Sequence, residues 1–258
     1  MFEWLKRFRK IAKRLTVAAR SEEKTARNTQ AINLKPYTPD AKAFLGQLAY
    51  LQLSNFEIMT AALKYSPNTQ YKAELGEAAA KSFDKYRQLS KKLVDLGADP
   101  AEQMNPFKER IATFHSNTSG LDWYEIVIKV YLTSGLLDDF YSKLASGLNE
   151  ELQSEVEKAL KDKTFDKFAK RVLSDAITTD TVLASRLAVW GRRLMGDVLL
   201  ELRAAFDNRK LAHVPKSRVL TVEEENKVNL AAYAKLEPLI SELTGAHSQR
   251  MEGLGLNA

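Results

Sequence analysis

The sequence contains no cysteine, which excludes disulfide bonds, thiolate metal sites and a cysteine nucleophile. This absence is consistent with a reducing compartment such as the cytoplasm. The chain also lacks any apolar run approaching the roughly 18 residues that a membrane-spanning helix requires. Its basic N-terminus is not followed by an apolar signal-peptide core or a small-residue cleavage site. We therefore expect a cytoplasmic protein.

Proline is scarce, and its positions predict where helices begin. The seven prolines lie at expected helix starts, in connectors or late in the last helix, never midway through a long periodic run. Thr38, Ser66 and Asp99 each precede a proline and suit the N-cap position of a helix. Thr221 and Glu224 have the spacing of a capping box.

Between these signals, apolar residues recur at the helical period, and no stretch alternates convincingly as a strand would. The predicted long helices cover residues 39–65, 67–96, 122–145, 149–176, 179–206 and 221–247, with a short helical connector at 100–116. Long helices joined by short links predict an all-α antiparallel bundle. We expect one bundle domain at residues 37–258, preceded by an arm and linker at residues 1–36.

The net charge of +6 is concentrated in this arm. Residues 1–20 contain seven basic residues and one acidic residue, so the other 238 residues sum to zero. Phe2, Leu5, Phe8 and Leu15 share one face at helical spacing, which predicts an amphipathic helix. The basic residues expected to make contacts are Lys6, Arg7, Arg9, Lys10, Lys13 and Arg14.

Three interpretations of the arm remain open. A basic amphipathic helix with aromatic residues is typical of an anchor at an anionic membrane surface, which would place the protein at the inner face of the membrane, and it also fits a groove on a protein partner. The same charges suit nucleic-acid phosphates, including those of tRNA. The apolar face could instead pack on the bundle or on a second subunit of a homo-oligomer.

Five segments, in the same order along the chain, resemble the MiaE-type tRNA-hydroxylase-like proteins of bacteria, a branch of the ferritin-like superfamily. They are residues 45–50 (LGQLAY), 96–100 (LGADP), 139–141 (DFY), 186–194 (RLAVWGRRL) and 247–256 (HSQRMEGLGL). The resemblance covers roughly residues 40–256. It implies a ferritin-like antiparallel four-helix bundle with additional C-terminal helices.

The resemblance also implies a non-haem di-iron enzyme that uses two iron ions to activate oxygen. Such sites take one carboxylate from each of two helices and a Glu-x-x-His pair from each of two others. In this sequence the six corresponding positions hold Gln52, Ser82, Lys85, Ser134, Asp162 and Phe165. Only Asp162 could still bind a cation, so we expect no cofactor. We interpret Gln52, Ser82 and Ser134 as small polar residues of the bundle interior, with a small-molecule pocket or an unusual metal site as the alternatives.

The histidines support the same expectation without any alignment. The chain has three, His115, His213 and His247, and the residues three positions before them are Ala112, Lys210 and Thr244. No Glu-x-x-His pair therefore exists anywhere in the sequence. We interpret the histidines as surface residues.

Two functions from different classes follow. The first is a non-catalytic ferritin-like binding or scaffold protein, a pseudoenzyme tethered by its basic arm. The alternative is an oxygen-dependent tRNA-modifying hydroxylase with unrecognised ligands. Arg192 and Arg193 are expected to pair with acids such as Asp197 and Glu201, with a phosphate contact as the alternative.

Overall fold

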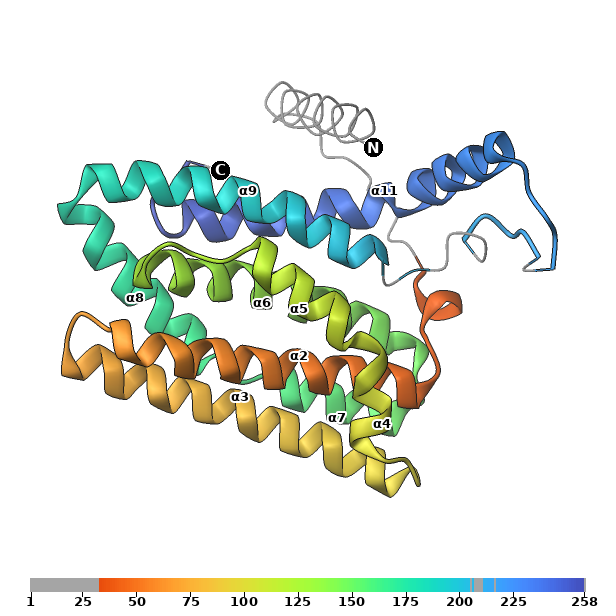
Figure 1. The fold of residues 1–258 in the computed structure, drawn as a ribbon, viewed down its shortest axis with the longest axis horizontal. Helices are drawn as coiled ribbons and strands as arrows, with labels where there is room; N and C mark the ends of the chain where they lie inside the picture. Colours follow the sequence, from red (N-terminus) through yellow and green to blue (C-terminus); the bar gives the residue numbers. More distant parts are fainter. Residues whose placement is uncertain (1–32, 205, 207–210, 216, 258) are drawn as a thin grey trace. The chain divides into compact units, whose positions relative to one another are not determined.

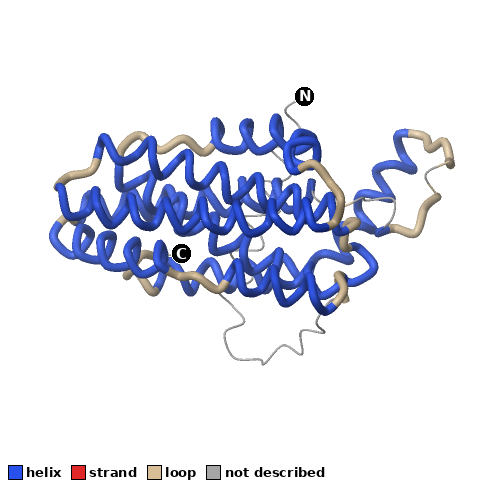
Figure 2. Tube along the Cα trace, turned by 90° about the horizontal axis from the view of Figure 1, so that it is seen from below, coloured by secondary structure: helices blue, strands red, loops and turns tan. Residues whose placement is uncertain are grey.

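The computed structural model of the 258-residue chain describes residues 33–204, 206, 211–215 and 217–257. Every regular element of these residues is a helix, as the sequence predicts (Figures 1 and 2). None of the described helices combines the length and the apolar character that a membrane span needs. The predicted arm helix, with its six basic contact residues, lies outside the described residues.

Short turns or single 3₁₀ turns join most of the helices. In chain order the elements are η1 (Lys35–Tyr37), α2 (Ala41–Ala62), η2 (Leu63–Tyr65), α3 (Thr69–Asp95), α4 (Pro100–Met104), η3 (Asn105–Phe107), α5 (Lys108–Asn117), α6 (Trp123–Leu144), η4 (Ala145–Gly147), α7 (Glu150–Leu160), α8 (Thr164–Thr179), α9 (Thr181–Ala204) and α11 (Val222–Glu252).

Four helical positions form a closed bundle. Helix α2 packs along α3, α3 contacts α7 and α8, both of these contact α6, and α6 returns to α2. The fourth position is thus shared by α7 and α8 in succession. Helices α9 and α11 contact each other and α6, and Figure 1 shows them on the side of α6 away from α3. This is the predicted four-helix bundle with additional C-terminal helices.

The prediction of one helix over residues 149–176 is wrong. The structure has α7 and α8 there, separated by residues 161–163. The carboxylate of Asp162 accepts hydrogen bonds from the backbone N–H of Thr164 at 3.2 Å and from its hydroxyl at 3.0 Å. An aspartate that binds the backbone two residues ahead favours a turn, so a new helix begins at Thr164.

Two of the predicted N-caps are also wrong. Asp40, not Thr38, caps α2, and Asn68, not Ser66, caps α3 through a 2.8 Å bond from the Tyr71 N–H. The hydroxyl of Thr38 instead donates to the carbonyl of Leu144 at 2.7 Å and ties the start of the bundle to the end of α6.

Two other helix starts agree with the sequence. Asp99 caps α4, and Thr221 with Glu224 forms the expected capping box at the start of α11. Helix α11 continues to Glu252, five residues beyond the predicted end. In this last part, Arg250 and Met251 meet Gly135 of α6 and Gly191 of α9, and these contacts stabilise the extra turn.

The apolar core consists of two clusters at different levels of the bundle. The first cluster includes Leu48, Leu51, Leu89, Phe140, Tyr141, Val156 and Leu160. The second cluster includes Met59, Ala79, Trp123, Tyr131, Phe168, Val172 and Leu187. Each of α2, α3 and α6 contributes to both clusters, whereas α7 belongs to the first and α8 to the second.

Candidate functional site

A polar layer crosses the bundle between the two apolar clusters. On α2, Leu51 belongs to the first cluster and Met59 to the second. Between them, Gln52 is 3% exposed and Asn55 is 9% exposed. Buried amides at this level are unusual for a core and require polar surroundings.

Polar residues interrupt the apolar faces of the other helices at the same level. The polar layer contains Ser82 and Lys85 on α3, Ser134 and Asp138 on α6, and Asp162, Phe165 and Asp166 around the start of α8. Since residues three or four apart share a helical face, each helix turns its pair toward the bundle axis.

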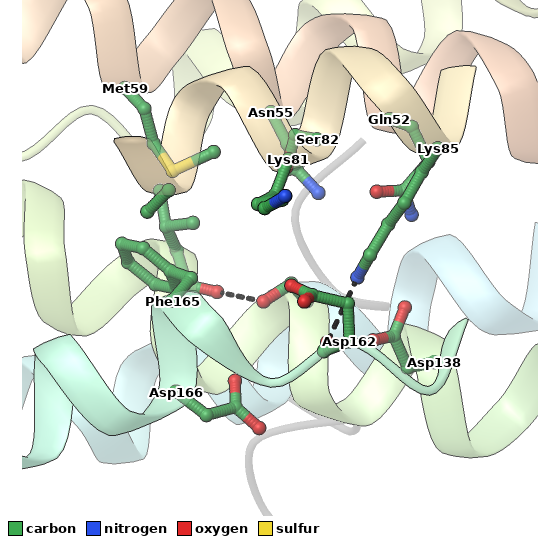
Figure 3. A pocket seen from close by; sticks show the side chains of 13 residues that line it. Gln52, Asn55, Met59, Lys81, Ser82, Lys85, Asp138, Asp162, Phe165 and Asp166 are labelled. Carbon is green, nitrogen blue, oxygen red and sulfur yellow. Dashed lines mark hydrogen bonds between the residues drawn. The ribbon is translucent and has the colours of Figure 1, made fainter. Parts of the chain in front are cut away.

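These residues line one small internal cavity (Figure 3). All six positions that the resemblance singles out are among the lining residues: Gln52, Ser82, Lys85, Ser134, Asp162 and Phe165. The structure therefore brings together residues from α2, α3, α6 and the α7–α8 junction that are up to 113 positions apart in the sequence. The space open to the centre of a water-sized sphere is about 20 Å³, which suits about one water molecule.

Lys85 extends across the cavity. Its ammonium group donates a 3.2 Å hydrogen bond to the backbone carbonyl of Asp162, the contact drawn in Figure 3. The acceptor is a main-chain carbonyl and not the Asp162 carboxylate.

Asp138 is the most deeply buried acid of the cavity, 9% exposed. Burial raises the pKa of Asp138 above its usual range, and the ammonium groups of Lys85 and Lys163 partly offset this effect. Lys163 lies 3.5 Å from the Asp138 carboxylate and 3.7 Å from that of Asp166. The buried acid is thus paired with Lys163, and the charge of Lys85 adds to the effect.

The remaining groups are engaged locally. The Ser134 hydroxyl donates to the carbonyl of Val130 on its own helix. The Asp162 carboxylate binds Thr164, as described above, and Phe165 contributes an aromatic ring. The only carboxylate among the six positions is therefore used to start α8.

Two iron ions do not fit this set of side chains. Iron in such bundles needs several carboxylates and imidazoles that point to one centre. Here five of the six positions hold an amide, a hydroxyl, an ammonium or a phenyl ring. Within the part of the chain that the structure describes, no group of three or more His, Asp or Glu side chains is arranged to hold a metal ion.

Four polar or charged lining residues were not among the predicted site positions: Asn55, Lys81, Asp138 and Asp166. Each lies one helical turn from a predicted position: Asn55 follows Gln52 by three residues, and Asp138 follows Ser134 by four. The signal was therefore available in the helical period. The family pattern concerns ligands alone and gives no reason to include these neighbours.

The arginine pair belongs to a different part of the molecule. The guanidinium of Arg193 lies 3.9 Å from Asp197 and over the Trp190 ring, as partly expected. Arg192 instead donates to the carbonyl of Asn257 at 2.7 Å. Glu201 pairs with Arg110 at 3.0 Å, so the prediction that it pairs with the arginine pair is wrong.

The segments that carry the resemblance also contact each other. A side chain at Gly191 would bring its Cβ to 2.4 Å from the sulfur of Met251, so the glycine permits α9 to approach the end of α11. Arg250 donates to Asp139 at 2.7 Å and to the carbonyl of Gly135 at 3.1 Å. Packing accounts for these conspicuous motifs without a ligand.

The prediction that all histidines are surface residues is wrong for two of them. His247 is 3% exposed, because it faces the α6–α9 side of the bundle, and His115 is half-buried. Burial, assisted by the Arg250 guanidinium, lowers the pKa of His247 to about 4. Burial and the charge of Lys129 lower the pKa of His115 to about 3. Both rings therefore stay neutral near pH 7, and neither lines the cavity.

Comparison with known proteins gives one match. The sequence model of a family described as "Ferritin-like domain, actinomycetes" matches residues 36–214, more than half of the chain. This range begins in η1 and includes all four helical positions of the bundle, together with α9. No curated protein matches the sequence.

Proposed function

Because the chain belongs to the actinomycete ferritin-like domain family, we propose that it is a non-catalytic member with a degenerate di-iron site. In this proposal the helical bundle serves as a binding or scaffold protein. The basic arm at residues 1–20 tethers it to an anionic membrane surface or to a partner. No cofactor is required.

The convergence of the six positions on one cavity supports this proposal. A misaligned family pattern would scatter them over different faces, whereas they lie together in the polar layer. Their chemistry is unsuited to iron, and the positively charged Lys85 reaches into the same space. A bundle that keeps the architecture of the site but not its ligands retains the scaffold without the oxygen chemistry.

The alternative is the MiaE-type activity, the oxygen-dependent hydroxylation of tRNA. It rests on the five segments that resemble that branch. Two of those segments and part of a third lie where α6, α9 and α11 pack together, away from the cavity. A packing role explains their presence without hydroxylation.

A direct assay separates the two functions. The purified full-length protein is incubated with unfractionated tRNA, ferrous iron, a reductant and oxygen, and the digested nucleosides are analysed by mass spectrometry. We expect no nucleoside heavier by one oxygen atom than in the control without protein. A modified nucleoside that appears only with the protein would overturn the proposal.

The tethering role rests on the distribution of charge. The arm carries the entire net charge of the chain, and the remaining residues sum to zero. Each basic residue near an anionic membrane contributes about 1 kcal/mol, so six net charges with aromatic residues suffice for measurable binding. Binding to tRNA with a steep salt dependence, and none to anionic vesicles, would replace this tethering role with a nucleic-acid contact.

A further inference from the structure

The charges around the cavity balance. Asp138, Asp162 and Asp166 line it together with Lys81 and Lys85, and Lys163 adds a third positive charge beside two of the acids. A polar cavity inside a bundle needs such a balance, because an uncompensated buried charge is costly.

The two lining lysines of α3 are not equivalent. Lys81 and Lys85 are one turn apart on the same helix, but Lys81 is exposed, whereas Lys85 is half-buried and hydrogen-bonded across the cavity. The charge of Lys85 also favours the ionised form of buried Asp138. Of the two, Lys85 therefore acts on the buried acid, whereas Lys81 lies at the exposed edge of the cavity.

We propose that the Lys85 ammonium, which reaches across the cavity, balances the charge of the acids that line it and excludes divalent metal ions from the polar layer. This inference deepens the proposed function and rests on it. The role assigned to Lys85 is structural and not catalytic.

Physical reasons favour exclusion by charge as well as by missing ligands. A divalent ion among the lining groups would share the cavity with the Lys85 ammonium, which reaches across it. At a separation of about 4 Å the repulsion between like charges remains substantial even under the effective screening of a protein interior. With the Lys85 side chain in place, the cavity leaves room for about one water molecule.

The test for exclusion compares two variants of identical composition. Gln52→Glu and Ser82→Glu add carboxylates in both, and the third change is Lys85→His in one and Lys81→His in the matched control. The first combination restores a Glu-x-x-His spacing on α3 and removes the internal ammonium. The second has the same net charge and keeps Lys85. Cobalt(II) serves as the probe, followed by calorimetry and visible absorption.

We expect the variant with Lys85→His to bind cobalt(II) at least about tenfold more tightly than the control with Lys81→His. A visible band typical of nitrogen and oxygen ligands should accompany binding. Equal affinities, or a folded Lys85→His variant that binds no cobalt(II), would overturn metal exclusion by Lys85. Circular dichroism establishes that both variants are folded.

The test for neutralisation uses changes that add no ligands and remains informative if the triple variants do not fold. Lys85→Met should lower the melting temperature clearly more than Lys81→Met, and Asp138→Asn should recover part of that loss. Equal effects of the two lysine changes, or no recovery with Asp138→Asn, would overturn the role of Lys85.

The outcomes separate this inference from the proposed function. Hydroxylation of tRNA by the native chain would refute the non-catalytic function whatever the lysine variants do. Failure of the lysine comparisons in an inactive protein would refute only the role of Lys85.

Discussion

The buried histidine of α11 allows a quantitative prediction about acid stability. His247 is 3% exposed, and burial, aided by Arg250 and opposed by a smaller effect of the Gly191 backbone, lowers its pKa from 6.5 to about 4. The unfolded chain therefore binds a proton at this residue more readily than the folded chain. By linkage, the contribution of His247 is fully present above pH 6.5 and is lost as the pH falls toward 4.

The magnitude follows from the size of the shift. One pKa unit corresponds to about 1.4 kcal/mol, so a shift of this size corresponds to about 3 kcal/mol lost between pH 6.5 and 4. His247→Gln keeps a polar side chain that does not titrate. We expect this variant to lose about 3 kcal/mol less than the native protein over the same pH range, whatever its stability at pH 7.

The measurement is urea unfolding followed by circular dichroism at a series of pH values, with the free energy of unfolding extrapolated to water. His213→Asn is the matched control, because His213 is exposed and its positive φ suits asparagine. This control should retain the loss of stability between pH 6.5 and 4 that His247→Gln removes. If His247→Gln follows the native curve in parallel between pH 6.5 and 4, then His247 titrates normally and the reasoning from burial is refuted.

Three further predictions address the arm and the contacts among α6, α9 and α11. Deletion of residues 1–20 should abolish sedimentation with anionic vesicles and leave the melting temperature nearly unchanged; a large loss of thermal stability would mean that the arm is part of the fold. Gly191→Ala should cost about 1–3 kcal/mol of unfolding free energy because its Cβ meets Met251, and Met251→Ala in the same chain should relieve the clash; additive losses would contradict this. Arg250→Met should cost about 2 kcal/mol in chemical denaturation by removing the bond to Asp139, and an unchanged midpoint would show that the pair contributes nothing.

Much of the fold could be predicted because its signals are local. Asp122 caps α6 and the apolar period continues to Leu144, so the predicted helix at residues 122–145 agrees closely with the structure. The break before α8 was missed because lysines flank Asp162 and are good helix formers. The burial of His247 was missed because it depends on which helix covers the C-terminal turn of α11, and no local pattern specifies that neighbour.

The candidate site was predictable in part for a similar reason. The resemblance located one position or pair on each of four helices, and helical geometry then placed these positions at one level. The contact of Lys163 with Asp138 links positions 25 apart through the packing of α6 against the α7–α8 junction. Such pairs depend on tertiary geometry, and the sequence contains no short-range sign of them.

The central claim is that this ferritin-like bundle does not use a di-iron centre, and the metal content of the native protein tests it most directly. The full-length chain is purified without chelators from iron-replete cells, and iron is measured by elemental analysis against protein concentration. We predict far less than one iron atom per chain, because five of the six family positions lack a carboxylate or an imidazole. A value close to the roughly two atoms of a di-iron protein would contradict the account.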